Sequence, residues 1–175
     1  MKTKLNQSAL KGAIVSAMLL GTATLIAPAY ATEQTANLNV SANINMSCTI
    51  TTTNLAFGNY DPIVTNLSDP LNKMASVTST CTVGSAGVIT LDNGDHYDEG
   101  LGRRMAHATE AGNYLTYSVS NASYGGANWG LGSEAVAYMG TGSAVEEDVY
   151  GSVAANQFTA EDGSYTDTII ASINY

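Results

Sequence analysis

The chain has 175 residues, with 15 acidic and 6 basic side chains and a formal net charge of −9 at neutral pH. Three of the six basic residues, Lys2, Lys4 and Lys11, lie at the extreme N-terminus, so the rest of the chain is more acidic still. Such a surface repels phosphate backbones and anionic lipid headgroups, which argues against nucleic acid and membrane surfaces as partners.

The first 31 residues have the pattern of a secretory signal peptide. The three lysines precede an apolar stretch, 13–26, and Ala29-Tyr30-Ala31 has the small-residue pattern of a cleavage site. The apolar stretch is shorter than the roughly 20 residues of a membrane-spanning helix. We therefore predict export with removal of 1–31 and no membrane insertion.

Apolar and polar residues alternate without interruption from Ala36 to Ile50. This period of two is typical of a strand with one buried face. Fifteen residues would span roughly 50 Å, whereas strands in compact domains usually have about 3–10 residues. We expect one part to pair within its own domain and the other with a second molecule. An ordinary long edge strand or hairpin arm is the alternative.

The chain has two cysteines, Cys48 and Cys81, which in an exported protein predict a disulfide. The bond would close a loop of about 34 residues and contribute roughly 3–4 kcal/mol in the chain-entropy model. Neither His96 nor His107 has the spacing of a metal ligand. No metal or other cofactor is predicted.

Short strand-like segments fill the rest of the chain, separated by Gly, Pro, Asn and Asp. The candidate strands are 54–58, 74–83, 87–91, 103–106, 114–120, 135–139, 149–154 and 165–175. No segment after the signal has a sustained helical repeat. We therefore expect an all-β fold, an immunoglobulin-like sandwich.

The last strand has apolar residues at alternate positions up to the final residue. These positions are Ile169, Ala171, Ile173 and Tyr175. Chain ends are normally frayed and polar, so this pattern indicates a docked end. The strand could dock in the protein's own sheet or serve as the edge against which an added strand pairs.

The acidic stretch 92–100 offers oxygen ligands for calcium but lacks the twelve-residue calcium-loop pattern, so a solvated hairpin loop is favoured. Arg103 and Arg104 are expected to pair with its acids. The sequence has no G-x-S-x-G or H-E-x-x-H motif, and we predict that the protein is not an enzyme. The acids are scattered over loops, so a secreted carbohydrate-binding or hydrolytic domain is a distant alternative.

Several short motifs occur in a characteristic order along the chain. They are Cys48-Thr49-Ile50, Leu55-Ala56-Phe57-Gly58-Asn59-Tyr60-Asp61-Pro62, Ser79-Thr80-Cys81-Thr82, Leu91-Asp92-Asn93-Gly94, Arg103-Arg104-Met105, Leu115-Thr116-Tyr117, Asn128-Trp129-Gly130 and Gly163-Ser164-Tyr165-Thr166-Asp167-Thr168. This set resembles the spore coat protein U domain family, which includes the pilin subunits of archaic chaperone–usher (Csu-type) pili.

The resemblance implies an immunoglobulin-like sandwich that is incomplete and lacks its last strand. A periplasmic chaperone would fill the gap first, and the N-terminal extension of the neighbouring pilin subunit would replace it by donor-strand exchange at an outer-membrane usher. On this interpretation 32–45 is the donor-strand extension and 46–175 is the pilin domain. The donor-strand anchors would be Ala36, Leu38, Val40, Ala42 and Ile44.

The resemblance also suggests a role and a location. Ile169, Ala171, Ile173 and Tyr175 would contact the chaperone, whose basic residues would bind the terminal carboxylate. The protein would be a structural subunit of an extracellular fimbrium for surface attachment and biofilm formation, exported through the periplasm. The alternative is a secreted coat or matrix protein that packs without strand exchange.

Overall fold

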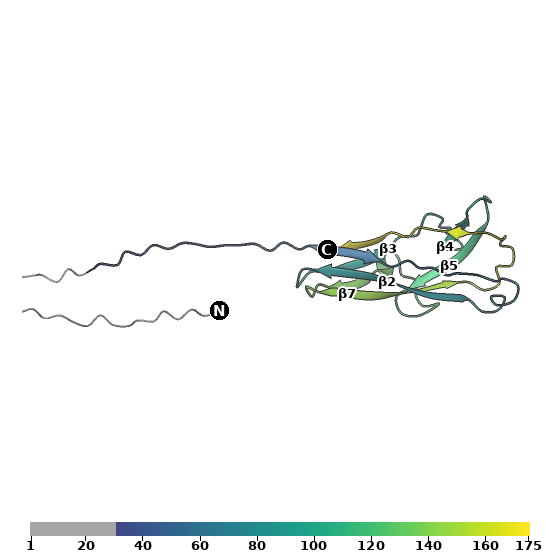
Figure 1. Cartoon of the computed structure of the whole chain (residues 1–175), viewed down its shortest axis with the longest axis horizontal. Helices are drawn as coiled ribbons and strands as arrows, with labels where there is room; N and C mark the ends of the chain where they lie inside the picture. The colour runs from purple at the N-terminus through teal and green to yellow at the C-terminus, as the bar shows by residue number, and fades with distance from the viewer. Residues whose placement is uncertain (1–30) are drawn as a thin grey trace, which may run out of the picture. The chain divides into compact units, whose positions relative to one another are not determined.

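The computed structural model describes residues 31–175, which fall into an N-terminal unit ending at Ser41 and a body from Ala42 to Tyr175 (Figure 1). Nearly all of the expected signal peptide lies outside the described residues. Residues 31–47 belong to no helix or strand, and their side chains are exposed. No helix within 31–175 is both long and apolar enough to cross a membrane.

The body is built from nine strands and one 3-10 turn. They are β1 (Cys48–Thr52), β2 (Leu71–Cys81), β3 (Ala86–Leu91), β4 (Arg103–His107), β5 (Tyr114–Ser120), η1 (Gly132–Glu134), β6 (Val136–Met139), β7 (Ala144–Val153), β8 (Tyr165–Thr166) and β9 (Ala171–Asn174). One sheet has the order β1-β2-β7-β5-β4-β8 and the other the order β6-β3-β9, with every pair antiparallel. The all-β prediction is confirmed.

Two expected strands differ from the structure. Residues 54–58 form no strand, because the ladder to β2 ends where the Thr53 N–H donates to the Ser76 carbonyl (3.0 Å). The expected strand 165–175 is divided into β8 and β9, because the chain crosses there from one sheet to the other. At the crossing the Ile170 N–H donates to the Asp92 carboxylate (2.9 Å).

Trp129 and Arg103 join the two layers in the core. Trp129 is fully buried, and its indole N–H donates to the Ile89 carbonyl (3.0 Å). The buried Arg103 guanidinium donates to the carbonyls of Asp92 (2.9 Å) and Trp129 (2.9 Å), and burial lowers its pKa. Arg103 therefore binds backbone carbonyls, where acidic partners were expected.

Arg104 does have an acidic partner, as the sequence suggested. Its guanidinium lies 3.4 Å from the Asp98 carboxylate and 4.1 Å above the ring centre of Tyr114. This pair fastens the acidic loop to β4, and the loop's negative charge is partly balanced there.

The predicted disulfide is confirmed and joins β1 to its single neighbour. Cys48 and Cys81 are directly opposite in the β1–β2 ladder, with Cα atoms 4.1 Å apart. β1 has only five residues and lies at the outer edge of its sheet. The covalent bond therefore reinforces a short edge strand that, within the described residues, pairs only with β2.

Replacing both cysteines, as Cys48→Ser with Cys81→Ser, should lower the free energy of unfolding by about 3–4 kcal/mol, because the unfolded chain regains the entropy of an open loop. Urea unfolding of soluble, folded protein measures the change, with Thr49→Ser on the exposed face of β1 as the control. An unchanged midpoint would show that β1 is held without the disulfide.

Candidate functional site

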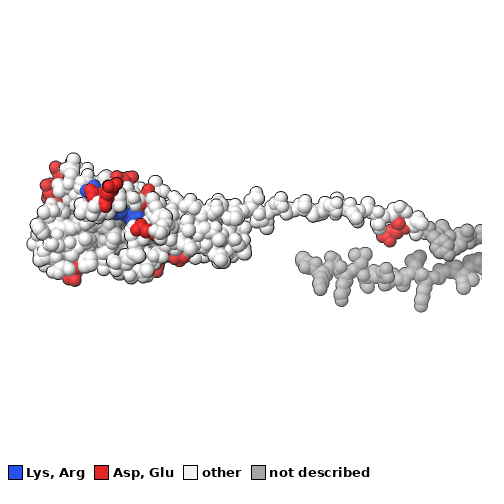
Figure 2. Space-filling view, turned by 180° about the vertical axis from the view of Figure 1, so that it is seen from behind, with Lys and Arg blue, Asp and Glu red and all other residues white. Residues whose placement is uncertain are grey.

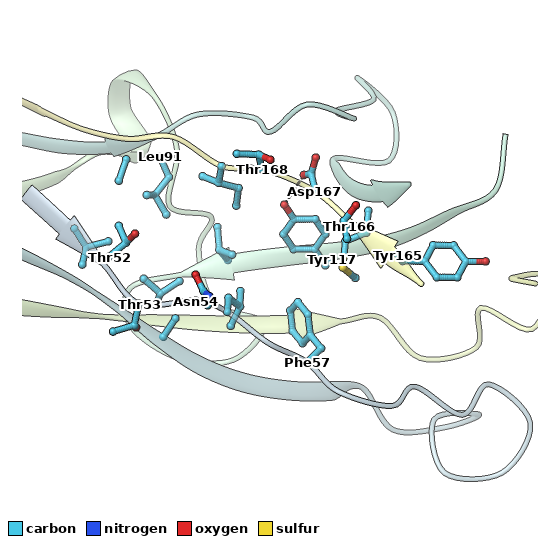
Figure 3. Close-up of a pocket in the computed structure, with 18 residues that line it drawn as sticks. Thr52, Thr53, Asn54, Phe57, Leu91, Tyr117, Tyr165, Thr166, Asp167 and Thr168 are labelled. Carbon is cyan, nitrogen blue, oxygen red and sulfur yellow. Dashed lines mark hydrogen bonds between the residues drawn. The ribbon is translucent and has the colours of Figure 1, made fainter. Parts of the chain in front are cut away.

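A long groove separates the segment that follows β1 from the segment that contains β8. One cavity, of about 600 Å³, lies between 52–57 and 165–171 (Figure 3), and a second, of about 700 Å³, lies between 55–62 and 160–166. Their linings have five residues in common: Leu55, Phe57, Met105, Tyr165 and Thr166. The two cavities are therefore adjacent, and we call them together the edge groove.

The floor of the first cavity of the edge groove includes apolar core residues. Val77, Val119 and Val149 contribute to it from β2, β5 and β7 and belong to the buried core. Each lies at an inward position of its strand, since strand side chains alternate between faces. The groove thus opens directly onto the core of the sandwich.

Gly151 of β7 makes room for two side chains that line the groove. A Cβ atom at this position would lie 2.5 Å from Leu55 and 3.0 Å from Phe57. The irregular segment 53–58 is therefore held against β7 by side-chain packing, without a backbone ladder.

Strand edges flank the groove on both sides. β1 pairs only with β2, β8 only with β4, and β9 only with β3 within the described residues. β1 and β9 lie close to one another without pairing. Unpaired edges of this kind offer N–H and C=O groups to an additional strand. One extended chain could thus pair with a groove edge and cover the apolar floor.

A buried carboxylate lies within this lining. The Asp167 side chain is 2% exposed and accepts hydrogen bonds from the Tyr117 hydroxyl (2.6 Å) and, at 3.0 Å, the His96 ring. Burial, followed by the hydrogen bond to Asp167, raises the pKa of Tyr117, which keeps the phenol protonated as a donor. Gly94 lies so close that a Cβ there would overlap the carboxylate.

Sequence reasoning missed this cluster, which ties the C-terminal segment to β5 and to the loop after β3. A signal was present, because Asp167 has the same parity as Ile169, Ala171 and Ile173. An acid in an otherwise apolar, inward-facing series indicates a buried charge with dedicated partners.

The predicted donor-strand anchors lie in the exposed part of the chain. Leu38, Val40 and Ile44 are 89%, 87% and 87% exposed. Ala36 and Ala42 are exposed as well. These positions occupy no groove in the single chain, so their role as anchors stays a prediction.

The four predicted chaperone-contacting positions are divided by their burial. Ile169, Ala171 and Ile173 are partly buried and pack against the core, and the first two line the edge groove. Tyr175 follows β9 and is exposed. The alternation therefore identifies inward-facing positions, while chaperone contact stays a prediction.

Comparison with known proteins identifies the family. The family model of the Spore Coat Protein U domain matches residues 34–172, so the chain belongs to this family. The chain is 33% identical over 180 residues to Protein U of Myxococcus xanthus, covering 96% of this chain and 99% of that protein.

A solved structure shows the same fold. It is the CsuC–CsuE chaperone–tip adhesion subunit pre-assembly complex from archaic chaperone–usher Csu pili of Acinetobacter baumannii. The match has a TM-score of 0.57 and 17% identity, and it covers 75% of this chain and 40% of the solved chain. The immunoglobulin-like fold is thereby confirmed.

Removing the buried carboxylate by Asp167→Ala should destabilise the body by about 1–3 kcal/mol, because the buried Tyr117 hydroxyl loses its acceptor. Chemical unfolding of soluble, folded protein measures the loss. Glu110→Ala, an exposed acid in the β4–β5 turn, is the control and should change little. Equal effects of the two variants would contradict a structural role for the cluster.

Proposed function

We propose that the protein is a structural subunit of a surface fibre of the archaic chaperone–usher type, polymerised by donor-strand exchange. The observation that carries this proposal is an apolar groove with unpaired edges in a body whose own N-terminal segment alternates and is exposed. The groove of one copy would receive the segment 36–44 of the next. β-strand addition supplies backbone hydrogen bonds, and the alternate side chains fill the floor.

The lengths of groove and segment support this pairing. Nine residues from Ala36 to Ile44 span about 30 Å when extended, and the twelve residues 160–171 along the groove span up to about 40 Å. The groove can therefore accept all five anchor positions. The segment's other face carries Asn and Ser, which would remain in water.

The position of the chain ends supports one polarity for the inserted strand. The Tyr138 hydroxyl lies 3.3 Å from the Cys48 sulfur, at the start of β1. Gly87 packs so closely that a Cβ there would contact both the Tyr138 ring and the carbonyl of Asn174, at the end of β9. The start of β1 and the end of β9 are thus at one end of the body (Figure 1). A donor antiparallel to β9 places the next body at the opposite end, which leaves each subunit's own extension free.

The same arrangement accounts for the expected partners and route. After export, a periplasmic chaperone would cover the groove and bind the terminal carboxylate of Tyr175. An outer-membrane usher would then exchange it for the next subunit's extension. The fibre would reach the cell surface and serve attachment and biofilm formation, a structural rather than catalytic role.

The family description favours one alternative, a secreted coat protein that packs without strand exchange. Such a protein would be a complete sandwich in the absence of residues 32–45. The mature chain shortened by this segment would then be a soluble, cooperatively folding monomer. The fibre proposal expects that shortened form to aggregate unless a chaperone is bound.

Val40→Asp should abolish polymers while leaving the chaperone-bound subunit intact, because a buried charge without a partner opposes insertion. Unheated SDS gels and electron microscopy of surface fibres measure the outcome. Ser41→Asp adds the same charge on the other face of the segment and should allow polymers. Normal fibres from Val40→Asp would contradict the anchoring role.

Grafting a copy of 36–44 after Tyr175 through a flexible linker should give a monomer that folds without a chaperone, because the copy fills the chain's own groove. Size-exclusion chromatography and thermal unfolding measure this result. This monomer is also the form in which the unfolding of the cysteine and Asp167 variants is compared. The matched control carries Val40→Asp within the grafted copy and should aggregate like the parent. If the unmodified graft aggregates equally, the groove does not accept this segment.

A further inference from the structure

The end of the body at which β1 begins has an uncharged cap with exposed apolar side chains. The cap consists of 82–85 and 139–143, joined by hydrogen bonds from Gly84 N–H to the Gly140 carbonyl (3.1 Å) and from Gly140 N–H to the Ser85 carbonyl (2.6 Å). Val83 and Met139 are 74% and 70% exposed on it. Neither segment contains a charged residue, and this end of the body is white in Figure 2. We call it the proximal cap.

The opposite end of the body carries a second apolar surface, on the loops 61–67 and 155–158. The Asn156 N–H donates to the Asn66 carbonyl (2.9 Å), which holds the two loops together. Ile63, Val64 and Phe158 are exposed on them. We call this surface the distal loops; they adjoin the end of the edge groove that residues 58–62 line.

The connection between a donor segment and its own body is short. Only Asn45, Met46 and Ser47 separate the last anchor, Ile44, from Cys48, a distance of at most about 13 Å. Thr82 of the proximal cap fixes this linker, since its hydroxyl accepts from the Ser47 N–H (3.1 Å) and its own N–H donates to the Ser47 carbonyl (3.0 Å). Insertion of a donor segment into a groove therefore brings the proximal cap of the donating subunit close to the end of that groove.

The charges of the two ends fit a contact between different ends of two copies. The distal end is acidic, with Asp61 in one loop and Glu161 and Asp162 beyond the other. Contact between two distal ends would place like charges together, which is unfavourable. The segments of the proximal cap contain no acid, and the terminal carboxylate of Tyr175 lies at the same end of the body. Val83 and Met139 are the exposed apolar side chains of this cap.

We propose that the proximal cap of each subunit packs end-on against the distal loops of the preceding copy, forming a second interface beside the inserted strand. This inference rests on the proposed fibre function, because donor-strand insertion brings the two surfaces together. The occupant of the distal loops is thus a second copy of this chain. The contact limits bending between consecutive bodies.

Paired cysteines in purified fibres test the contact. A chain with Val83→Cys and Val64→Cys should form bonds between consecutive copies on mild oxidation. Boiling in SDS without reductant should then leave a ladder, which reductant converts to monomer. A second pair, Met139→Cys with Ile63→Cys, should behave in the same way if the first pair folds poorly.

The control chain combines Val83→Cys with Leu131→Cys, an exposed apolar position on the β5–β6 connection. Its oxidised fibres should give only monomer after boiling in SDS without reductant. If both test pairs give a ladder in unheated SDS gels but only monomer after boiling, the end-on contact is refuted. Such a result would still agree with donor-strand exchange. Absence of the unheated ladder from the unmodified chain would refute the fibre proposal itself, and the inference with it.

Discussion

Within residues 31–175 no strand pairs with both β1 and the C-terminal segment, and this constraint is the one on which the rest of the structure depends. The core of a sandwich is protected from water when strands cover both of its edges. Here residues 53–58 form no ladder, and within the described residues β8 and β9 each pair with one strand only. The floor between them includes Val77, Val119 and Val149 of the buried core. An additional strand would satisfy backbone and side-chain requirements in the same step.

Much of this arrangement could be predicted from the sequence, because strand periodicity reports faces directly. The alternation from Ala36 to Ile50 predicted an apolar row too long for one domain, which stays a prediction. The parity of Ile169, Ala171 and Ile173 predicted inward positions that the structure confirms. The disulfide was predictable from export and cysteine count alone. Its exact opposition in the β1–β2 ladder was not, because register depends on which strands meet.

The features that sequence reasoning missed are those that tertiary contacts decide. The strand propensity of 54–58 has no effect where a neighbouring strand is missing. Arg103 was expected to find an acid, yet its position between the sheets presents carbonyls of Asp92 and Trp129 instead. Asp167 became buried because Tyr117 and His96, distant in sequence, converge on it. The parity of Asp167 indicated burial, but no local pattern identifies which distant side chains would meet it.

The distribution of charge determines how an acidic chain of this kind can associate with itself. Beyond residue 31, its basic side chains are Lys73, Arg103 and Arg104. Arg103 is buried and donates to carbonyls, and Arg104 is paired with Asp98. Few basic side chains therefore remain for salt bridges between copies. Residues 34–53 and the proximal cap carry no charge at all. Cohesion in the proposed fibre therefore rests on backbone hydrogen bonds and apolar contact, which salt screens far less than ion pairs.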